Sequence, residues 1–410
     1  MRAWSHAAAL SIGVALVANS CGLTESATKG EIIIASDFPT SGSIRVGGRP
    51  GEAGVAYAVQ LASPLKGFKL VHVPYDDSIN GSQDEQLGAR NFTEMANDPK
   101  VLGVVGPYNS NVARKAIPIA NRAELAVVSP SNTGTCLTQD FAFCDPKPSA
   151  LRDPSKPNGY FRIVAPDSLQ GFAMADFAYD VLKITRVAVW SDSVQFGKHV
   201  ADAFATRFEA RGGVIVARQD FPFIVQKKDF TPFFKRAKDA GAEGIYAGAV
   251  TGTGGCTAKA QAKGIIDVYY LGSDGIGDSQ CIKDAADQAN DKMYFTVAAP
   301  VAAQDPANKS LIDAFMKAFP QEDDLGPYTF LGYDSARILI DAIGRAIDAA
   351  GGNMPTRHQV LDAVQNTRSL KLSTGTYSFD KNGDATSPTM AFYQVKNGVW
   401  TFAKQFAVGQ

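Results

Sequence analysis

The chain has 410 residues, of which 45% are hydrophobic and 20% are charged. A chain of this length and composition can bury a large core, which excludes a disordered protein and favours two or three domains. Its 40 basic and 41 acidic residues give a formal net charge of -1 and form no long block of either sign, so no nucleic acid or anionic membrane surface is expected as a partner.

The N-terminal segment is typical of an export signal. It contains one arginine, an apolar run over residues 7–18 and small residues before Cys21, and it is too short to span a bilayer comfortably. The small residues resemble a bacterial lipobox, although Ala18 stands where leucine is usual. We predict a signal peptide with a lipobox over residues 1–21, a lipidated N-terminus at Cys21 and a flexible tether over residues 22–30. Ordinary export with cleavage nearby is the alternative.

Strands and helices alternate in the first part of the body. Short runs rich in Val and Ile are apolar on both faces, and longer stretches between them show helical spacing of apolar residues. This alternation predicts a parallel sheet covered by helices on both sides. The expected strands cover residues 31–38, 68–77, 101–107 and 125–130, and the expected helices cover residues 49–63, 82–98 and 111–124.

The pattern stops at residues 138–159, which carry four prolines and little periodicity. We predict a long surface excursion there. The alternation then restarts, which predicts a second doubly wound sheet, and the chain ends in segments with two Asn-Gly pairs, which are typical of hairpin turns. The further strands are expected at residues 186–192, 213–222, 243–250, 268–274 and 293–300, and further helices at 308–319 and 333–350.

Four cysteines remain beyond Cys21, an even number that allows three disulfide connectivities. Proximity in the sequence favours Cys136 with Cys144 and Cys256 with Cys281. Metal binding is the rival interpretation, but neither pair has tight spacing and no histidine lies close to either. Disulfides also suit an exported protein.

The ends of the expected strands are rich in Gly, Ser, Thr and Asn, as in "GPYNSN", "SPSNTG" and "GSDGIG". In open parallel sheets ligands bind beyond the carboxyl ends of the strands. Helix capping accounts for some of these residues. However, Ser129, Ser131, Asn132 and Thr133 crowd a single strand end, which is more than one cap requires. The pattern predicts a ligand site in a cleft between two α/β lobes, built from groups that hydrogen bond without imposing charge.

With these motifs in place, the chain resembles the branched-chain amino-acid binding proteins of bacterial ABC importers, which have the type I periplasmic-binding fold. The resemblance covers nearly all of the mature chain, and the motifs follow one another in the order found in the family. The matching stretches include "SDFPTSG", "VVGPYNS", "VVSPSNTGTCLT", "YFRIVAPDSLQG", "VAVWSDSVQFG", "LGSDGIG" and "GPYTFLGYDS". The resemblance implies two doubly wound lobes joined by a three-segment hinge: an N-terminal lobe of residues 30–166 and 300–387, and a C-terminal lobe of residues 167–299 and 388–410.

The resemblance also implies roles for single residues. The ligand's α-carboxylate would be held by Ser110 and by the loop of Ser131, Asn132 and Thr133, with Asn111 as a further candidate beside Ser110. Asp274 would take the α-ammonium, whose desolvation in a closed cleft requires a carboxylate partner. Phe196 and Tyr328 would close over the ligand, and these rings together with Trp190 suit apolar side chains.

Three positions depart from the family pattern. Gly47 and Ala249 stand where tyrosines are often found, and Phe196 replaces a third tyrosine. Asp274 is one methylene shorter than the glutamate often found there. We therefore expect a different, roomier pocket for an amino acid, branched-chain or otherwise apolar, or for a small amide-like relative.

The function implied is that of an extracytoplasmic solute-binding lipoprotein of an ABC importer. It would close two lobes on a small ligand at the outer face of the cytoplasmic membrane or in the periplasm, and present it to a membrane permease with a cytoplasmic ATPase. A ligand-sensing receptor of the same fold, which feeds a signalling partner, is the first alternative.

An exported α/β enzyme is the second alternative, and the residues speak against it. No Gly-x-Ser-x-Gly elbow frames any serine. The glycines of "AGAVTGTGGC" suggest a dinucleotide loop, but Thr257 stands where the third glycine is needed. "DKNGDA" lacks the acid at its twelfth position that a calcium loop requires. No enzyme activity, no cofactor and no metal are expected.

Overall fold

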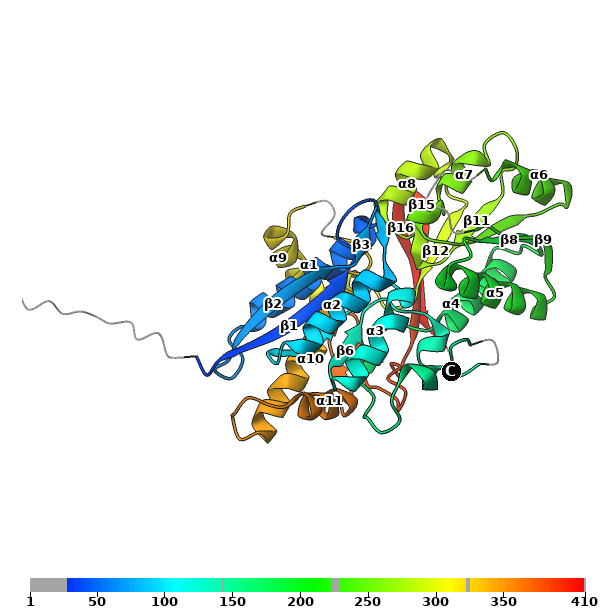
Figure 1. The fold of residues 1–410 in the computed structure, drawn as a ribbon. Helices are drawn as coiled ribbons and strands as arrows, with labels where there is room; N and C mark the ends of the chain where they lie inside the picture. The colour runs from blue at the N-terminus through cyan, green and yellow to red at the C-terminus, as the bar shows by residue number, and fades with distance from the viewer. Residues whose placement is uncertain (1–27, 142–143, 223–228, 322–324, 409–410) are drawn as a thin grey trace, which may run out of the picture.

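The computed structural model describes residues 28–141, 144–222, 229–321 and 325–408. The predicted signal peptide, the predicted lipidation at Cys21 and most of the tether lie outside these residues. Within the described part of the chain, no helix is both long and apolar enough to cross a membrane. Figure 1 shows two α/β lobes, with the last two strands of the chain running where the lobes meet.

The first lobe is built on a five-stranded parallel sheet whose strand order is that of a doubly wound fold. Helices α1 and α10 pack together on one side, and α2 and α3 pack together on the other. The strands in spatial order are β2 (Lys69–Asp76), β1 (Glu31–Phe38), β5 (Val101–Val105), β6 (Ala126–Ser129) and β7 (Tyr160–Arg162). The helices are α1 (Arg45–Ala62), α2 (Glu85–Asn97), α3 (Ser110–Arg122), α9 (Lys309–Ala318), α10 (Thr329–Ala349) and α11 (Arg357–Gln365).

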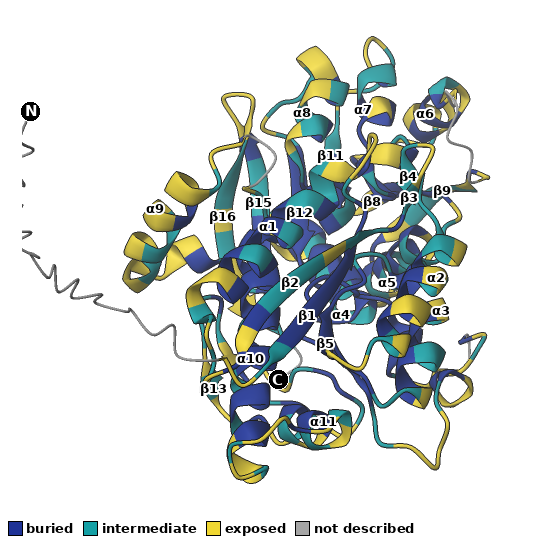
Figure 2. Ribbon diagram, turned by 60° about the vertical axis from the view of Figure 1, so that its left-hand side comes forward, coloured by how far each residue is buried: buried dark blue, intermediate teal, exposed yellow. Residues whose placement is uncertain are grey.

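Strand β1 shows why its sequence is apolar throughout. Successive side chains of a strand point to opposite faces of the sheet. Ile32 and Ile34 lie in one apolar cluster with residues of α1 and α10, whereas Ile33 and Ala35 lie in another with residues of α2 and α3. Both faces must therefore be apolar, and Figure 2 shows β1 and β5 buried at the centre of the lobe.

The second lobe is built on a seven-stranded sheet in which five parallel strands are followed by an antiparallel hairpin. Its strands in spatial order are β9 (Val214–Asp220), β8 (Arg186–Ser191), β10 (Gly244–Gly248), β11 (Tyr269–Gly272), β12 (Met293–Val297), β15 (Thr389–Lys396) and β16 (Val399–Ala407). Its helices are α4 (Asp167–Asp176), α5 (Gln195–Ala210), α6 (Thr231–Asp239), α7 (Thr257–Gln261) and α8 (Ser279–Ala285).

The chain passes between the two sheets three times. The crossings lie between β7 and α4, between β12 and α9, and between the short strand β14 (Thr376–Tyr377) and β15. The first two crossings are hydrogen-bonded to each other, because the amide of Ala165 donates to the carbonyl of Ala298 at 2.7 Å. The predicted lobe limits, after residues 166, 299 and 387, fall in these connections, and as limits they stay a prediction.

The two Asn-Gly pairs behave differently. Asn397 and Gly398, with φ of 53° and 74°, form the expected turn between β15 and β16. At Asn382 and Gly383 the expected hairpin strands do not form; the chain instead makes a tight loop closed by the carboxylate of Asp380, which accepts from the amide of Asn382 at 2.8 Å. A Cβ on Gly383 would lie 2.1 Å from the carbonyl oxygen of Tyr160, so glycine is needed where this loop packs on the first sheet.

A buried carboxyl lies at the end of β1. Asp37 is fully buried, and its Oδ1 accepts from Nδ2 of Asn91 at 2.7 Å, whereas no described residue donates a hydrogen bond to its Oδ2. Burial, reinforced by the nearby carboxyls of Glu52 and Asp76, raises the pKa of Asp37 to about 8. The folded protein therefore holds a proton at neutral pH that the unfolded chain releases.

The sign of this pKa shift predicts a pH dependence of stability. The contribution of Asp37 is fully present below pH 3.8 and is lost as the pH rises through about 8. Asp37→Asn mimics the protonated form, so we expect a gain on the order of a few kcal/mol at pH 8 and little change at pH 4. Urea unfolding at both pH values measures this difference; an equal effect at the two would contradict it.

Candidate ligand-binding site

A cavity of about 50 Å³ lies between the two lobes, at the carboxyl ends of their parallel strands. Seven of the eight residues predicted to bind the ligand line it. Ser110, Asn111, Ser131, Thr133 and Tyr328 come from the first lobe, and Phe196 and Asp274 from the second. Whether they contact a ligand remains a prediction.

One wall of the cavity presents neutral hydrogen-bond donors. Ser110 begins helix α3, so the N–H groups of the first turn have no intrahelical partner and form the positive end of the helix dipole. The Oγ of Ser110 accepts from the amide of Gly134 at 3.0 Å, which leaves its proton free to donate. No lysine, arginine or histidine is among the described residues that line the cavity. An anionic group would therefore be met by hydroxyl and amide donors.

Asn132 and Trp190 lie elsewhere, contrary to expectation. Asn132 is fully buried; its amide nitrogen donates to the carbonyl of Tyr108 at 2.8 Å, and its Oδ1 accepts from the hydroxyl of Tyr160 at 2.9 Å. Trp190 is also fully buried, and its ring packs against Phe230 at 4.8 Å in the core of the second lobe. Asn132 thus fixes the loop, and Trp190 belongs to the hydrophobic core.

A buried arginine holds the donor loop from behind. Arg162 at the end of β7 is fully buried, and its Nε donates to Oδ1 of Asp384 at 2.7 Å. One terminal nitrogen of its guanidinium donates to the carbonyls of Asn132, at 3.1 Å, and Gly134, at 2.9 Å. Arg162 therefore joins the loop of residues 131–134 to the third crossing. No sequence pattern singles out this arginine, because β7 is only three residues long and is not among the expected strands.

The opposite side of the cavity carries one carboxylate with an unpartnered oxygen. Asp274 lies two residues after β11 and is 7% exposed. Its Oδ2 accepts from the hydroxyl of Tyr328, and its Oδ1 has no hydrogen-bond partner within the described part of the chain. Burial raises the pKa of Asp274 to about 6, although the hydrogen bond from Tyr328 opposes the shift. A cationic group in the cavity would supply the missing partner of Oδ1 and favour the ionised form.

Aromatic rings close the cavity from both lobes. Phe196 stands in the first turn of α5, and Tyr328 immediately precedes α10. Tyr108, which sequence reasoning did not single out, also lines the cavity and meets Tyr328 edge to face, with ring centroids 5.1 Å apart. Its position at a predicted strand end, next to Ser110, was the available signal.

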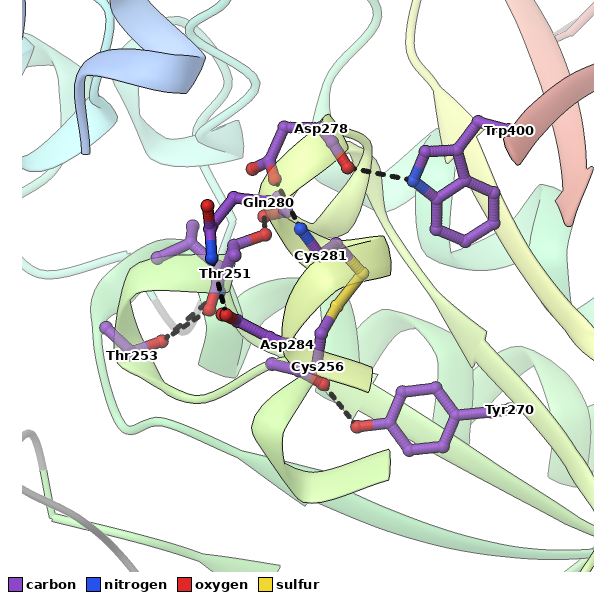
Figure 3. The surroundings of a disulfide bond; sticks show 12 residues. Thr251, Thr253, Cys256, Tyr270, Asp278, Gln280, Cys281, Asp284 and Trp400 are labelled. Carbon is purple, nitrogen blue, oxygen red and sulfur yellow. Dashed lines mark hydrogen bonds between the residues drawn. A yellow bond between two sulfur atoms is a disulfide. The ribbon is translucent and has the colours of Figure 1, made fainter. Parts of the chain in front are cut away.

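Both expected disulfides are present. Cys256–Cys281 lies behind the second-lobe wall (Figure 3), where it ties the loop that carries Thr251 to helix α8. The carboxylate of Asp278 caps α8 by accepting from the amide of Cys281 at 2.8 Å, and its carbonyl accepts from the indole of Trp400 at 3.0 Å. The glycine-rich stretch considered as a dinucleotide loop thus forms part of this braced wall.

Cys136–Cys144 stabilises the start of the surface excursion in the first lobe. Cys136 lies in a short 3-10 helix, Thr135–Leu137, that directly follows the donor loop. The disulfide therefore anchors the excursion close to Thr133 and Gly134.

Comparison with known proteins agrees with this geometry. A family model described as periplasmic binding protein matches residues 31–399. The leucine-, isoleucine-, valine-, threonine-, and alanine-binding protein of Pseudomonas aeruginosa is 26% identical over 370 residues, which cover 88% of this chain and 89% of that protein.

Solved structures share the fold. The leucine binding protein LivK of Thermotoga maritima superposes with a TM-score of 0.77 at 23% identity, covering 92% of this chain and 98% of that one. A solute binding protein of an ABC transporter from R. palustris, in complex with 4-hydroxybenzoate, has a TM-score of 0.74 at 18% identity, covering 92% and 97%. Together with the match of the family model, the two lobes and the cavity between them show that the chain belongs to the periplasmic binding protein family, whose members are extracytoplasmic solute-binding proteins.

Proposed function

We propose that the protein binds a free α-amino acid in the cavity between its lobes and delivers it to an ABC permease. The observation that carries this proposal is that neutral hydrogen-bond donors line one side of a small cavity and a buried carboxylate lines the other. Neutral donors at Ser110 and in the loop of residues 131–134 face inward from the first lobe, and the unpartnered Oδ1 of Asp274 faces inward from the second. An α-amino acid, whose carboxylate and ammonium groups are attached to the same carbon atom, fits this arrangement.

Each charged group of the ligand has a physical partner. The carboxylate takes hydrogen bonds from the hydroxyl of Ser110 and from the N-terminal amides of α3, where the helix dipole favours an anion. The ammonium group donates a hydrogen bond to Oδ1 of Asp274 and so supplies the partner that this buried oxygen lacks. Asn111, Ser131 and Thr133 complete the polar wall around the carboxylate, and Phe196 and Tyr328 exclude water.

Ligand contacts to both lobes provide the mechanism of closure. A ligand shifts an equilibrium between open and closed forms by its differential affinity for the two forms. Because the donors and Asp274 belong to different lobes, both sets can contact the ligand only when the cleft is closed. The three crossings then act as the hinge, and the closed form is the one recognised by the permease.

The proposal includes a place in the cell. A lipid on Cys21 and a flexible tether over residues 22–30 would hold the lobes at the outer face of the cytoplasmic membrane, within reach of the permease. Transport is preferred to sensing because the relative that binds five amino acids aligns with 88% of this chain, and the solute binding protein of an ABC transporter superposes on 92% of it.

The experiment that tests the proposal identifies the ligand directly. Mass spectrometry of molecules released from gently purified protein is expected to find an α-amino acid. A thermal-shift panel of amino acids, amides and aromatic acids is expected to stabilise the protein with amino acids only, because binding to the folded state raises its stability. Stabilisation by an aromatic acid without an ammonium group, and by no amino acid, would overturn the proposal.

A further inference from the structure

The side chain of Tyr108, which lines the cavity, occupies the space that a side chain at position 47 would need. Gly47 lies in α1, and a Cβ built on it would approach the hydroxyl oxygen of Tyr108 at 2.9 Å and the ring carbon Cζ at 3.2 Å. Both residues line the cavity. Positions 47 and 108 therefore share one volume, and with Tyr108 in this position no side chain larger than that of glycine fits at 47.

The position of Tyr108 is fixed at both ends. Its backbone carbonyl accepts from the hydroxyl of Ser131 and from the side-chain amide of Asn132, both at 2.8 Å. Its ring packs edge to face on Tyr328 at 5.1 Å and lies 6.3 Å from the ring of Phe38. The backbone of Tyr108 is thus held by the donor loop, and its ring packs on the residue that bonds Asp274.

The hydroxyl of Tyr108 has no hydrogen-bond partner among the described residues, although the side chain is half-buried and faces the cavity. Burial, together with the carboxylates of Asp274 and Asp278, keeps the pKa of this phenol well above its ordinary value. The phenol is therefore a neutral group that can donate to, or accept from, a polar atom of the ligand.

We propose that Tyr108 is a specificity-determining residue, which restricts the cavity to α-amino acids with a short side chain and favours one that carries a hydroxyl, such as threonine, over leucine. This inference rests on the proposed function. The ring of Tyr108 fills the space beside Gly47, and leucine, which exceeds alanine by a whole isopropyl group, would need that space. The side chains of Ile44, Val194 and Val250, which also line the cavity, suit the methyl group of threonine.

The test is calorimetric titration of the ligand-free full chain with L-threonine, L-valine and L-leucine. Threonine and valine have nearly the same shape and differ by one hydroxyl. For the wild type we expect threonine to bind about threefold to tenfold more tightly than valine. We expect leucine to bind at least ~10-fold more weakly than threonine.

Variants separate the two effects of Tyr108. Tyr108→Phe keeps the ring and removes the hydroxyl, so valine and threonine should bind alike while leucine stays excluded. Tyr108→Leu clears space beside Gly47, so the affinity for leucine should rise about tenfold. Gly47→Ala, an ordinary helix substitution, should displace the phenol and reduce the preference for threonine. Tyr75→Phe in β2, outside the cavity, is the matched control and should change nothing.

The outcomes distinguish this inference from the function on which it rests. If no amino acid binds the wild type, the proposed function is overturned and the inference falls with it. If leucine binds the wild type as tightly as threonine, and Tyr108→Leu leaves that ratio unchanged, the inference alone is overturned. Circular dichroism and the thermal midpoint of each variant establish that it is folded, and Tyr108→Phe and Gly47→Ala still test the inference if Tyr108→Leu is not.

Discussion

Replacing Asp274 by asparagine is expected to weaken amino-acid binding by about 3 kcal/mol or more, which is at least roughly a hundredfold in Kd. The substitution keeps the size of the side chain and its bond with the Tyr328 hydroxyl, but it leaves a buried ammonium without a counter-charge. Isothermal titration with the amino acid identified for the wild type measures the loss. Asp239→Asn, an exposed aspartate at the end of α6, is the matched control.

The pH dependence of binding provides a second test of the same residue. In the ligand-free protein the pKa of Asp274 is about 6, and only the ionised carboxylate pairs with an ammonium. Affinity should therefore be constant above pH 7 and should fall by up to about tenfold per pH unit well below pH 6. Asp274→Asn should abolish this dependence. Undiminished affinity in the variant, or a wild-type affinity that does not change with pH, would contradict the role of Asp274.

Replacing Arg162 by methionine is expected to destabilise the fold by about 3–5 kcal/mol, because it leaves the buried carboxylate of Asp384 without its cation. The carbonyls of Asn132 and Gly134 lose their donor as well. Differential scanning calorimetry should show a fall in the melting midpoint on the order of 10 °C. The exposed Arg122→Met, at the end of α3, should change the stability by less than about 0.5 kcal/mol.

The effect of Arg162→Met should also depend on pH. Burial alone would raise the pKa of Asp384, but the guanidinium of Arg162 outweighs it and holds the pKa below its ordinary value. The contribution of this pair is present at neutral pH and is lost as the pH falls through that lowered pKa. Destabilisation by Arg162→Met should therefore be smaller near pH 3 than at pH 7. A variant as stable as the wild type at pH 7 would show that the pair does not support the donor loop.

Most of the architecture could be predicted from the sequence, because strands and helices are indicated by local, periodic patterns of apolar residues. An apolar run such as β1, with helical patterns before and after it, leaves few arrangements other than a covered parallel sheet. The same logic located the cavity, since the carboxyl ends of parallel strands meet at one edge of the sheet. Ser110, Thr133 and Asp274, each within five residues of a strand end, consequently lie around one space.

The failures concern features that depend on tertiary contacts. Asn132 stands between two lining residues, yet its side chain turns inward because the Tyr108 carbonyl and the Tyr160 hydroxyl are available there. Trp190 lies in the core because the faces of a central strand are both covered. The strand-end position of Tyr108 could indicate that it lines the cavity, but its contact with Gly47, which is distant in sequence, could not be read from a local pattern.

The hydrogen bond between Tyr328 and Asp274 joins the two lobes through protein atoms alone. A direct bond of this kind favours the closed form even before a ligand binds, so less of the ligand's binding energy is needed for the movement, and the observed Kd moves closer to that of the closed form. The same hydrogen bond makes the ligand-free and ligand-bound proteins similar in shape. Discrimination by the permease would then depend on how long each stays shut rather than on shape alone.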